Sequence, residues 1–363
     1  MSGTISKYET KSGPRYRVQY RKPDKSVTGK RGFKTKKEAS LFLASVTLKK
    51  VNGDYVDPTQ GRRTVAMFAE QWKTSHLPKL KVSSREGMLS SYRTHVEGRW
   101  GHRAVSSIRP SEIEDWIGEL SGARAAQTVR RAAFALSQIL NIAERDRVIP
   151  RSPMAGVKLP KKSRKPPRYL THAQVETLAT CAEHPDFVRF LAYTGLRWGE
   201  AVELQVRDLD MLRRRISIER NAVYVKGSYA VGTPKTGERR EVPMPHFLVT
   251  TLARACEGKT RTGYVFGDGI AQLPYPHSEF GWFTKAVKAA QQVDDTIPRV
   301  TPHDLRHTAA SLAIQSGANV KAVQRMLGHA SAAMTLDVYA DLFEEDLDDV
   351  AEAMAEARAR AVS

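Results

Sequence analysis

Two short segments divide this chain of 363 residues into three parts and limit how it can fold. Residues 57–63 read DPTQGRR, and residues 158–168 read KLPKKSRKPPR. Proline, glycine and clustered basic side chains do not build a core, so both segments are predicted to be linkers. We therefore expect separate parts at residues 1–57, 64–157 and 169–363.

The first part is predicted to be a small sheet with one helix. From residue 15 to residue 21 apolar and basic side chains alternate, which indicates a strand with one apolar and one cationic face. A second strand is expected near residues 26–31 and a helix near residues 36–48, where Thr35 and Glu38 have the spacing of a capping box. The cationic face is interpreted either as a solvated basic hairpin or, because its charge lies on one side, as a surface that contacts DNA phosphates through Arg15, Arg17 and Arg21.

The second part has the apolar periodicity of an all-α bundle. Apolar residues recur at helical spacing, first at Val65, Phe68 and Trp72 and last between residues 129 and 143. These positions are predicted to be core. The basic linker that follows is interpreted either as a solvated tether or as a strap along the DNA backbone; its cations include Lys161, Lys162, Arg164 and Lys165.

The third part mixes helices with short strands. Ile216 with Ile218, and Val223 with Val225, alternate as strand residues do, and helical patterns surround them. The fold class is therefore predicted to be α+β and multidomain. In it, a mainly α domain with a small antiparallel sheet follows a β-sheet-plus-helix domain and an all-α bundle.

The overall charge predicts a polyanionic partner. Lys and Arg number 58 against 39 Asp and Glu, a net charge of +19, which suits nucleic acid first and an anionic membrane surface second. Only Cys181 and Cys256 are present, so a disulfide framework and a four-cysteine zinc site are excluded. Without a run of 18 apolar residues or a hydrophobic signal core, the protein is expected to be soluble and intracellular.

Residues suited to phosphate chemistry are concentrated in the third part. In YTGLRWGE, Arg197 follows Gly195, where a helix is predicted to end. A guanidinium presents a rigid fork of donors to two phosphate oxygens, and Glu200 is spaced to hold it. In TPKTGERREVP, Lys235 stands on a predicted turn, from which a flexible lysine can enter a groove.

Further polar residues follow in TPHDLRHT, LGHAS and MTLDVYAD. His303 and Arg306 are three residues apart, on one face of a helix predicted to be capped by Thr301. His329 follows the glycine that ends the next helix, and Tyr339 comes ten residues later. Arginines can neutralise a phosphate, imidazoles can carry protons, and a tyrosine can attack phosphorus.

His303 and His307 also have the i, i+4 spacing of an HExxH zinc site. The second residue is aspartate, an arginine lies inside the motif, and no third ligand is evident. No metal is therefore expected, and His307 is interpreted as a buried, supporting histidine.

In this order and spacing the motifs closely resemble the catalytic signature of the tyrosine recombinases, the phage integrase family. The resemblance covers about half of the chain with strong motifs and the N-terminal half more loosely. It implies that Tyr339 is the nucleophile. The other implied catalytic residues are Arg197, Lys235, His303, Arg306 and His329, supported by Glu200 and His307.

In the implied reaction Tyr339 attacks a DNA phosphate, leaving a 3′-phosphotyrosyl link and a free 5′-hydroxyl, with no metal, nucleotide or other cofactor. The two arginines stabilise the charge on phosphorus, and His303 assists removal of the tyrosine proton. The resemblance implies that Lys235 donates a proton to the leaving oxygen and that His329 contacts the phosphate or that oxygen.

The resemblance also implies domains and partners. Residues 1–57 resemble an arm-type DNA-binding domain, residues 64–157 a core-binding domain, and residues 169–363 the catalytic domain with a tail helix. Four protomers are expected to recombine double-stranded DNA at core and arm-type attachment sites through a four-way junction, integrating or excising phage or mobile-element DNA. A host DNA-bending factor and an excision directionality factor are expected partners, in the cytoplasm of a bacterial host.

Three alternatives stay open. A type IB topoisomerase uses the same chemistry on one duplex, although it does not need the basic first part. A catalytically silent, sequence-specific DNA-binding protein would not need the complete set of polar residues, and a zinc hydrolase would need a third ligand. The abundance of Arg and Ala is typical of a GC-rich actinobacterial source, such as the host of a mycobacteriophage.

The tail of the chain is predicted to be an amphipathic helix. Leu347, Val350, Ala351 and Met354 recur at helical spacing and form an apolar stripe. The stripe is expected to cover either its own domain or a neighbouring protomer.

Overall fold

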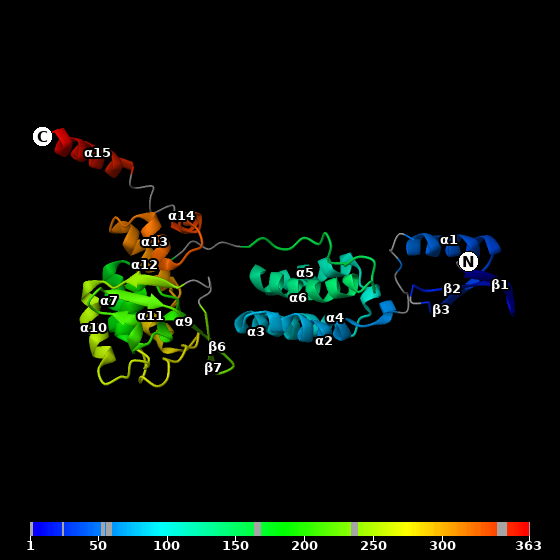
Figure 1. The fold of residues 1–363 in the computed structure, drawn as a ribbon, viewed down its shortest axis with the longest axis horizontal. Helices are drawn as coiled ribbons and strands as arrows, with labels where there is room; N and C mark the ends of the chain where they lie inside the picture. The colour runs from blue at the N-terminus through cyan, green and yellow to red at the C-terminus, as the bar shows by residue number, and fades with distance from the viewer. Residues whose placement is uncertain are drawn as a thin grey trace. The chain divides into compact units, whose positions relative to one another are not determined.

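The computed structural model describes residues 3–23, 25–51, 55, 60–162, 168–233, 239–339 and 347–362. The chain forms two compact units, residues 1–164 and residues 165–363, and each is described by itself (Figure 1). No described helix is long and apolar enough to cross a membrane.

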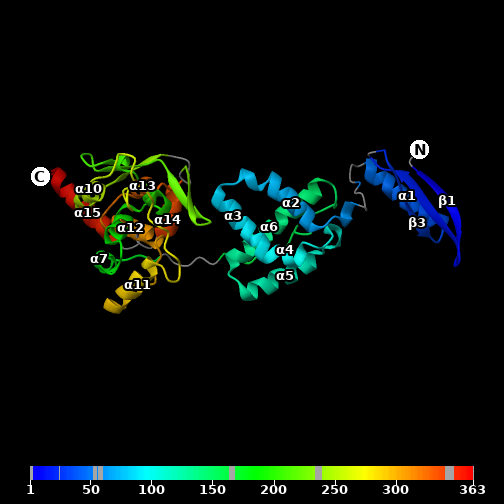
Figure 2. The same ribbon diagram turned by 90° about the horizontal axis from the view of Figure 1, so that it is seen from below.

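The first unit begins with a three-stranded antiparallel sheet in the order β1-β2-β3. The strands are β1 (Gly3–Thr10), β2 (Gly13–Arg21) and β3 (Val27–Phe33). Helix α1 (Lys36–Val51) lies along the sheet and contacts all three strands (Figure 2). Val18 and Tyr20 of β2 are buried in the small core between them. Because side chains alternate along a strand, the arginines of β2 lie on the other face, where Arg17 donates to Ser6 Oγ at 2.7 Å.

A helical bundle with a separate core follows in the same unit. Its helices are α2 (Val65–Ser75), α3 (Val82–Ser91), the π-helix η3 (Tyr92–Val96), α4 (Glu97–Trp100), α5 (Pro110–Ala123) and α6 (Ala126–Arg145). Short 3-10 turns are η1 (Gln60–Arg62), η2 (Leu77–Lys79) and η4 (Val105–Ser107). Trp72, Tyr92 and Trp100 are fully buried in the core, and Trp72 was predicted to lie there from its helical spacing.

Each predicted linker lies partly outside the described residues. In the first, Gly61 is buried against the bundle, and Ser106 Oγ donates to its carbonyl oxygen at 2.7 Å, so this stretch belongs to the bundle. In the second, Lys161 and Lys162 are exposed. Arg164 and Lys165 lie outside the described residues, and contact of this linker with DNA stays a prediction.

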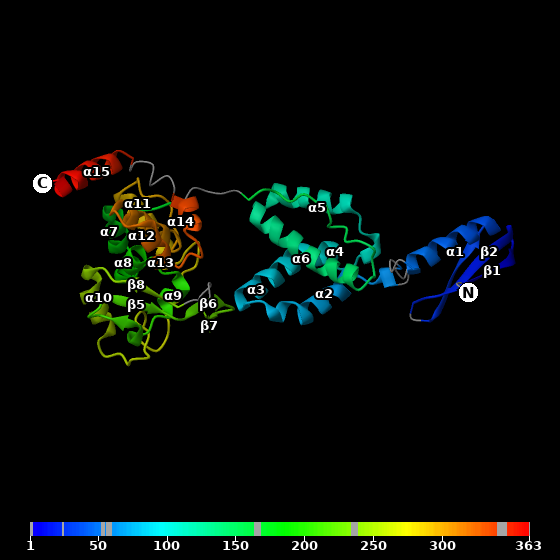
Figure 3. The ribbon, with the colours of Figure 1, turned by 45° about the horizontal axis from the view of Figure 1, so that its top comes forward.

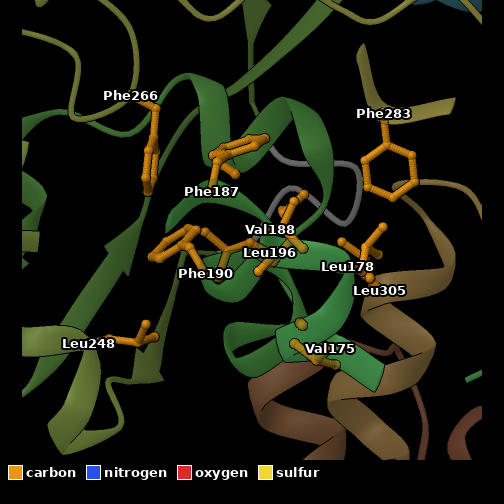
Figure 4. Close-up of a cluster of buried hydrophobic side chains, with 14 of the residues drawn as sticks. Val175, Leu178, Phe187, Val188, Phe190, Leu196, Leu248, Phe266, Phe283 and Leu305 are labelled. Carbon is orange, nitrogen blue, oxygen red and sulfur yellow. The ribbon is translucent and has the colours of Figure 1, made fainter. Parts of the chain in front are cut away.

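The second unit is built on a helical core. It contains α7 (His172–Thr180), α8 (Pro185–Thr194), α9 (Trp198–Val202), α10 (His246–Cys256), α11 (Trp282–Val293) and α12 (Asp304–Gln315). Helix α8 packs against α7 and α12. The rings of Phe187 and Phe190 both contact Phe266 within the core (Figure 4).

Two small antiparallel sheets border this helical core. One has the order β4-β5-β8, and the other is the hairpin β6-β7. The strands are β4 (Leu209–Asp210), β5 (Arg215–Ile218), β6 (Asn221–Val225), β7 (Ser228–Gly232) and β8 (Arg240–Pro243), and the 3-10 turn η5 (Val206–Asp208) precedes β4. Ile216 pairs with Val242, and both are buried. Strand β7 was not predicted, and the turn that carries Lys235 lies outside the described residues.

The chain continues with α13 (Val320–Leu327), α14 (Ala332–Tyr339) and α15 (Leu347–Val362). Helix α13 packs against α12, α14 and β8, so segments distant in sequence meet there (Figure 3). In α15 the described side chains are exposed; Met354, part of the predicted stripe, is 69% exposed.

Candidate active site

Arg197 lies where the chain leaves one helix and enters the next. Gly195 ends α8 with a φ of 64°, a left-handed conformation that glycine adopts without strain, and Arg197 caps α9. The backbone N–H of Arg197 donates to Glu200 Oε2 at 3.0 Å, and its Nη1 donates to Oε1 at 2.8 Å. Glu200 is buried, whereas the Arg197 side chain is 21% exposed. The carboxylate therefore holds Arg197 in place while part of its guanidinium stays accessible.

Arg240, which the sequence did not single out, grips the same carboxylate from strand β8. Its Nη1 and Nη2 donate to Glu200 Oε1 at 3.0 Å and Oε2 at 2.6 Å. Burial acts to raise the pKa of Glu200, but the hydrogen bonds and charges of Arg240 and Arg197 outweigh it and lower that pKa to about 2. Arg240 is two residues before the buried Val242 and shares its inward face, a strand pattern that could have revealed it.

Arg306 brings a third guanidinium to this region. It is 4% exposed and donates through Nη1 to the carbonyl of Gly195 at 2.7 Å and through Nη2 to the carbonyl of Leu327. Burial, followed by repulsion from Arg197, lowers its pKa to about 9, so it remains charged at neutral pH. Arg197 and Arg240 pair with the carboxylate of Glu200, whereas Arg306 donates to backbone carbonyls. Three guanidinium charges against one carboxylate leave two positive charges for an anion.

Tyr339, at the end of α14, points into the protein. It is 2% exposed, and burial raises its pKa to about 12 against the opposing influence of Arg306. Its hydroxyl lies 2.8 Å from Nδ1 of His307, and burial lowers the pKa of that imidazole. A neutral histidine is therefore in contact with the predicted nucleophile.

His303 lies one helical turn before His307. The two rings are 5.3 Å apart between centroids and nearly perpendicular. His303 is open to solvent on one side, and the surrounding protein, followed by His307 and Arg306, lowers its pKa to about 4. The described hydrogen bond of the Tyr339 hydroxyl is to His307. The family resemblance instead implies that His303 assists removal of the tyrosine proton.

His329 follows the left-handed Gly328 that ends α13. Its Nδ1 lies 2.9 Å from Oγ1 of Thr335, a fully buried residue of α14 that the sequence did not single out. Burial, followed by the charges of Arg306 and Arg197, lowers the pKa of His329 to about 4. The structure thus brings His329 into the field of the two predicted phosphate-binding arginines.

His303 and His307 have the sequence spacing of a zinc site. Within the described part of the chain, no group of three or more His, Cys, Asp or Glu side chains is arranged to hold a metal ion. Nδ1 of His307 is instead engaged by Tyr339. The local chemistry is that of arginines, neutral imidazoles and a phenol.

The fold and this cluster agree with the comparisons to known proteins. Residues 168–346 match the model of the phage integrase family, so the catalytic part of this chain belongs to that family, the tyrosine recombinases. The chain is accordingly a tyrosine-type site-specific recombinase.

Individual relatives cover most of the chain. The transposase of transposon Tn916 from Enterococcus faecalis is 28% identical over 325 residues, which span 83% of this chain and 80% of the relative. The integrase of transposon Tn1549, solved in complex with transposon right-end DNA, superposes with a TM-score of 0.66 at 23% identity, over 80% of this chain and 100% of that one. A lambda integrase tetramer bound to a Holliday junction superposes with a TM-score of 0.56 at 15% identity, over 90% of this chain and 96% of that one. These two structures show that the fold is shared.

Proposed function

We propose that this protein integrates or excises a phage or mobile element by cutting and rejoining DNA through Tyr339. One observation carries the proposal: a buried tyrosine is hydrogen-bonded to a neutral histidine beside a guanidinium cluster with excess positive charge. A phosphodiester supplies the missing anion, and its phosphorus is the electrophile that a phenolate attacks.

Cleavage forms a bond between Tyr339 Oη and phosphorus and breaks the bond from phosphorus to the 5′-oxygen. The tyrosine proton passes to His307, which is already in contact, and His303 continues the path toward solvent. Arg197 and Arg306 stabilise the negative charge that grows on the non-bridging oxygens. A phenol of pKa about 12 needs both kinds of assistance at neutral pH.

The 5′-oxygen takes up one proton as it leaves. Lys235 is proposed to donate this proton as the general acid, and His329 to contact the phosphate or the leaving oxygen. The phosphotyrosyl link conserves the energy of the phosphodiester, so rejoining needs no nucleotide. Attack on the link by a 5′-hydroxyl of a second duplex exchanges strands.

The assembly proposed for this chain is a homotetramer on two double-stranded DNA sites. The DNA complex of the Tn1549 integrase and the Holliday-junction tetramer of the lambda integrase support this arrangement. The basic strand β2 is proposed to bind arm-type sites, and the helical bundle and basic linker to bind the core site. A host DNA-bending factor, a directionality factor and action in the bacterial cytoplasm belong to the same proposal.

The test is to trap the covalent intermediate. The crossover site is first mapped by sequencing the DNA that flanks the gene for a core repeat, for instance within a tRNA gene. A nicked suicide duplex with this site should form an adduct that resists denaturing electrophoresis. Tyr339→Phe should form none while its gel-shift affinity stays unchanged.

Two outcomes would contradict the proposal. One is an adduct formed by Tyr339→Phe or mapped by mass spectrometry to Tyr193 or Tyr224. The other is relaxation of supercoiled DNA that lacks the crossover site, without strand exchange, which would favour the topoisomerase.

A further inference from the structure

Arg240 connects three segments that the proposed reaction needs. It is the first residue of β8, directly after the segment that carries Lys235. Its two terminal nitrogens hold the carboxylate of Glu200, and its Nε donates to the carbonyl of Met326 at 3.1 Å. With 9% of its side chain exposed, it has little room to adopt another rotamer.

The contact with Glu200 fixes the orientation of Arg197. Each oxygen of Glu200 accepts one hydrogen bond from Arg240 and one from Arg197, so the carboxylate is shared between the two arginines. Without Arg240, the buried carboxylate would keep a single partner and would draw the Arg197 guanidinium further onto itself. The donors that Arg197 presents to a phosphate would then be misplaced.

The contact with Met326 fixes the end of α13. Arg240 and Arg306 donate to consecutive carbonyls, those of Met326 and Leu327, in the last turn of this helix. Cations are favourable there because the carbonyls at a helix C-terminus carry partial negative charge. The next residue is Gly328, where an added Cβ would lie 2.9 Å from Cδ of Arg240, and His329 follows. Arg240 therefore lies against the turn that presents His329.

We propose that Arg240 is a positioning residue of the active site, acting through Glu200 on Arg197 and through the end of α13 on His329. Its described hydrogen bonds are to Glu200 and Met326, so it is proposed to act through these groups. Its placement depends on the pairing of β8 with β5, so the arginines assemble correctly only when the strand after the Lys235 segment is docked. The inference rests on the proposed function, whose reaction provides its readout.

The experiment measures single-turnover cleavage of the suicide duplex by full-length protein. Arg240→Gln should reduce the rate about 10- to 100-fold, by analogy with the loss when a residue that orients a metal ligand is removed. Arg240→Lys should recover little, because an ammonium cannot make the two-pronged contact with Glu200 and reach Met326 as well. The matched control is Arg239→Gln, since the neighbouring Arg239 side chain is 80% exposed and should be replaceable without loss.

A second substrate separates positioning from simple destabilisation. In a methylphosphonate at the scissile position, the charged oxygen that Arg197 neutralises is replaced by a methyl group. The loss caused by Arg240→Gln should be smaller on this neutral substrate than on the phosphate. An equal loss on both substrates, or no loss on either, would overturn the proposal. If Arg240→Gln does not fold, the cleavage rates of Arg240→Lys on the two substrates are compared in its place. Failure of the wild-type protein to form any adduct would instead reject the proposed function.

Discussion

The hydroxyl of Tyr339 lies 2.8 Å from Nδ1 of His307, inside the fold. The contact pairs a phenol whose pKa is raised to about 12 with an imidazole whose pKa is lowered by burial. The acid therefore holds its proton tightly while the base stays neutral and able to accept it. The negative charge of a bound phosphate would raise the basicity of the histidine, so DNA itself favours the transfer.

Replacing His307 should slow chemistry and spare binding. In His307→Gln the amide oxygen can still accept the hydrogen bond of Tyr339 but cannot take its proton. The rate of adduct formation should fall about 10²- to 10⁴-fold, the range for loss of a general base. The control is His246→Gln, at an exposed histidine of the same domain. If His307→Gln cleaves at the wild-type rate, His303 and not His307 accepts the tyrosine proton.

Stability should fall on acidification through the histidine range. His303 and His329 have folded pKa values of about 4 against 6.5 for the free side chain. Between these values the unfolded chain binds protons that the folded protein does not, so acid favours unfolding. In His329→Gln the melting temperature should fall less steeply from pH 7 to pH 4.5 than in the wild type. Parallel curves would show that His329 does not titrate in this way.

Removing the positive charges of β2 should weaken binding to arm-type DNA and leave cleavage of the core site unchanged. The triple change Arg15→Gln, Arg17→Gln and Arg21→Gln should keep suicide cleavage of the core site and lose integration on full-length sites. Each phosphate contact that is lost should reduce the salt dependence of arm-site binding by about 0.9 log units per log unit of salt. Equal losses at core and arm sites would contradict a dedicated arm-binding surface.

Removing the tail helix should impair assembly before it impairs folding. The described side chains of α15 are exposed, so a chain ending after Phe343 should keep its melting temperature and its affinity for one core site. Pairing of two labelled duplexes, followed on native gels, should weaken if the apolar stripe docks on a neighbouring protomer. A truncated protein with normal pairing and recombination but a lower melting temperature would show instead that the helix covers its own domain.

Recombination should proceed in EDTA without ATP. The proposed charge stabilisation comes from arginines, which need no metal, and the phosphotyrosyl link stores the energy for rejoining. Integration assays with and without excess EDTA should give equal yields. Loss of suicide cleavage in EDTA, restored by zinc alone, would favour the hydrolase alternative.

Local rules predicted the positions of several site residues. Glycines at the ends of α8 and α13 made it possible to expect Arg197 and His329 just beyond those helices, as observed. The predicted start of α12 is two residues too early. A cap at Thr301 predicts Pro302 as the first helical residue, but the N–H and hydroxyl of Thr301 both donate to the Asp304 carboxylate at 2.7 Å, and the helix begins at Asp304.

The contacts that shape the site could not be predicted from local sequence. Alternation along β8 places Arg240 on the inward face, but its partner Glu200 follows only from the pairing of β8 with β5 and its packing on α13, which local sequence does not show. The same holds for Thr335, which reaches His329 across the turn between α13 and α14. Strand β7 was missed because its residues SYAVG lack a buried face.

The buried charge of Arg306 contributes little to the stability of the free protein. Its buried charge is satisfied by carbonyl oxygens and repelled by Arg197, so the free protein gains little from keeping it. A sequence optimised for the stability of the free protein would place an apolar side chain there, as replacements of buried charges in other proteins illustrate. If Arg306 contacts a DNA phosphate, as proposed, its charge gains an anionic partner only in the DNA-bound state. The phosphodiester would then complete the packing of this domain.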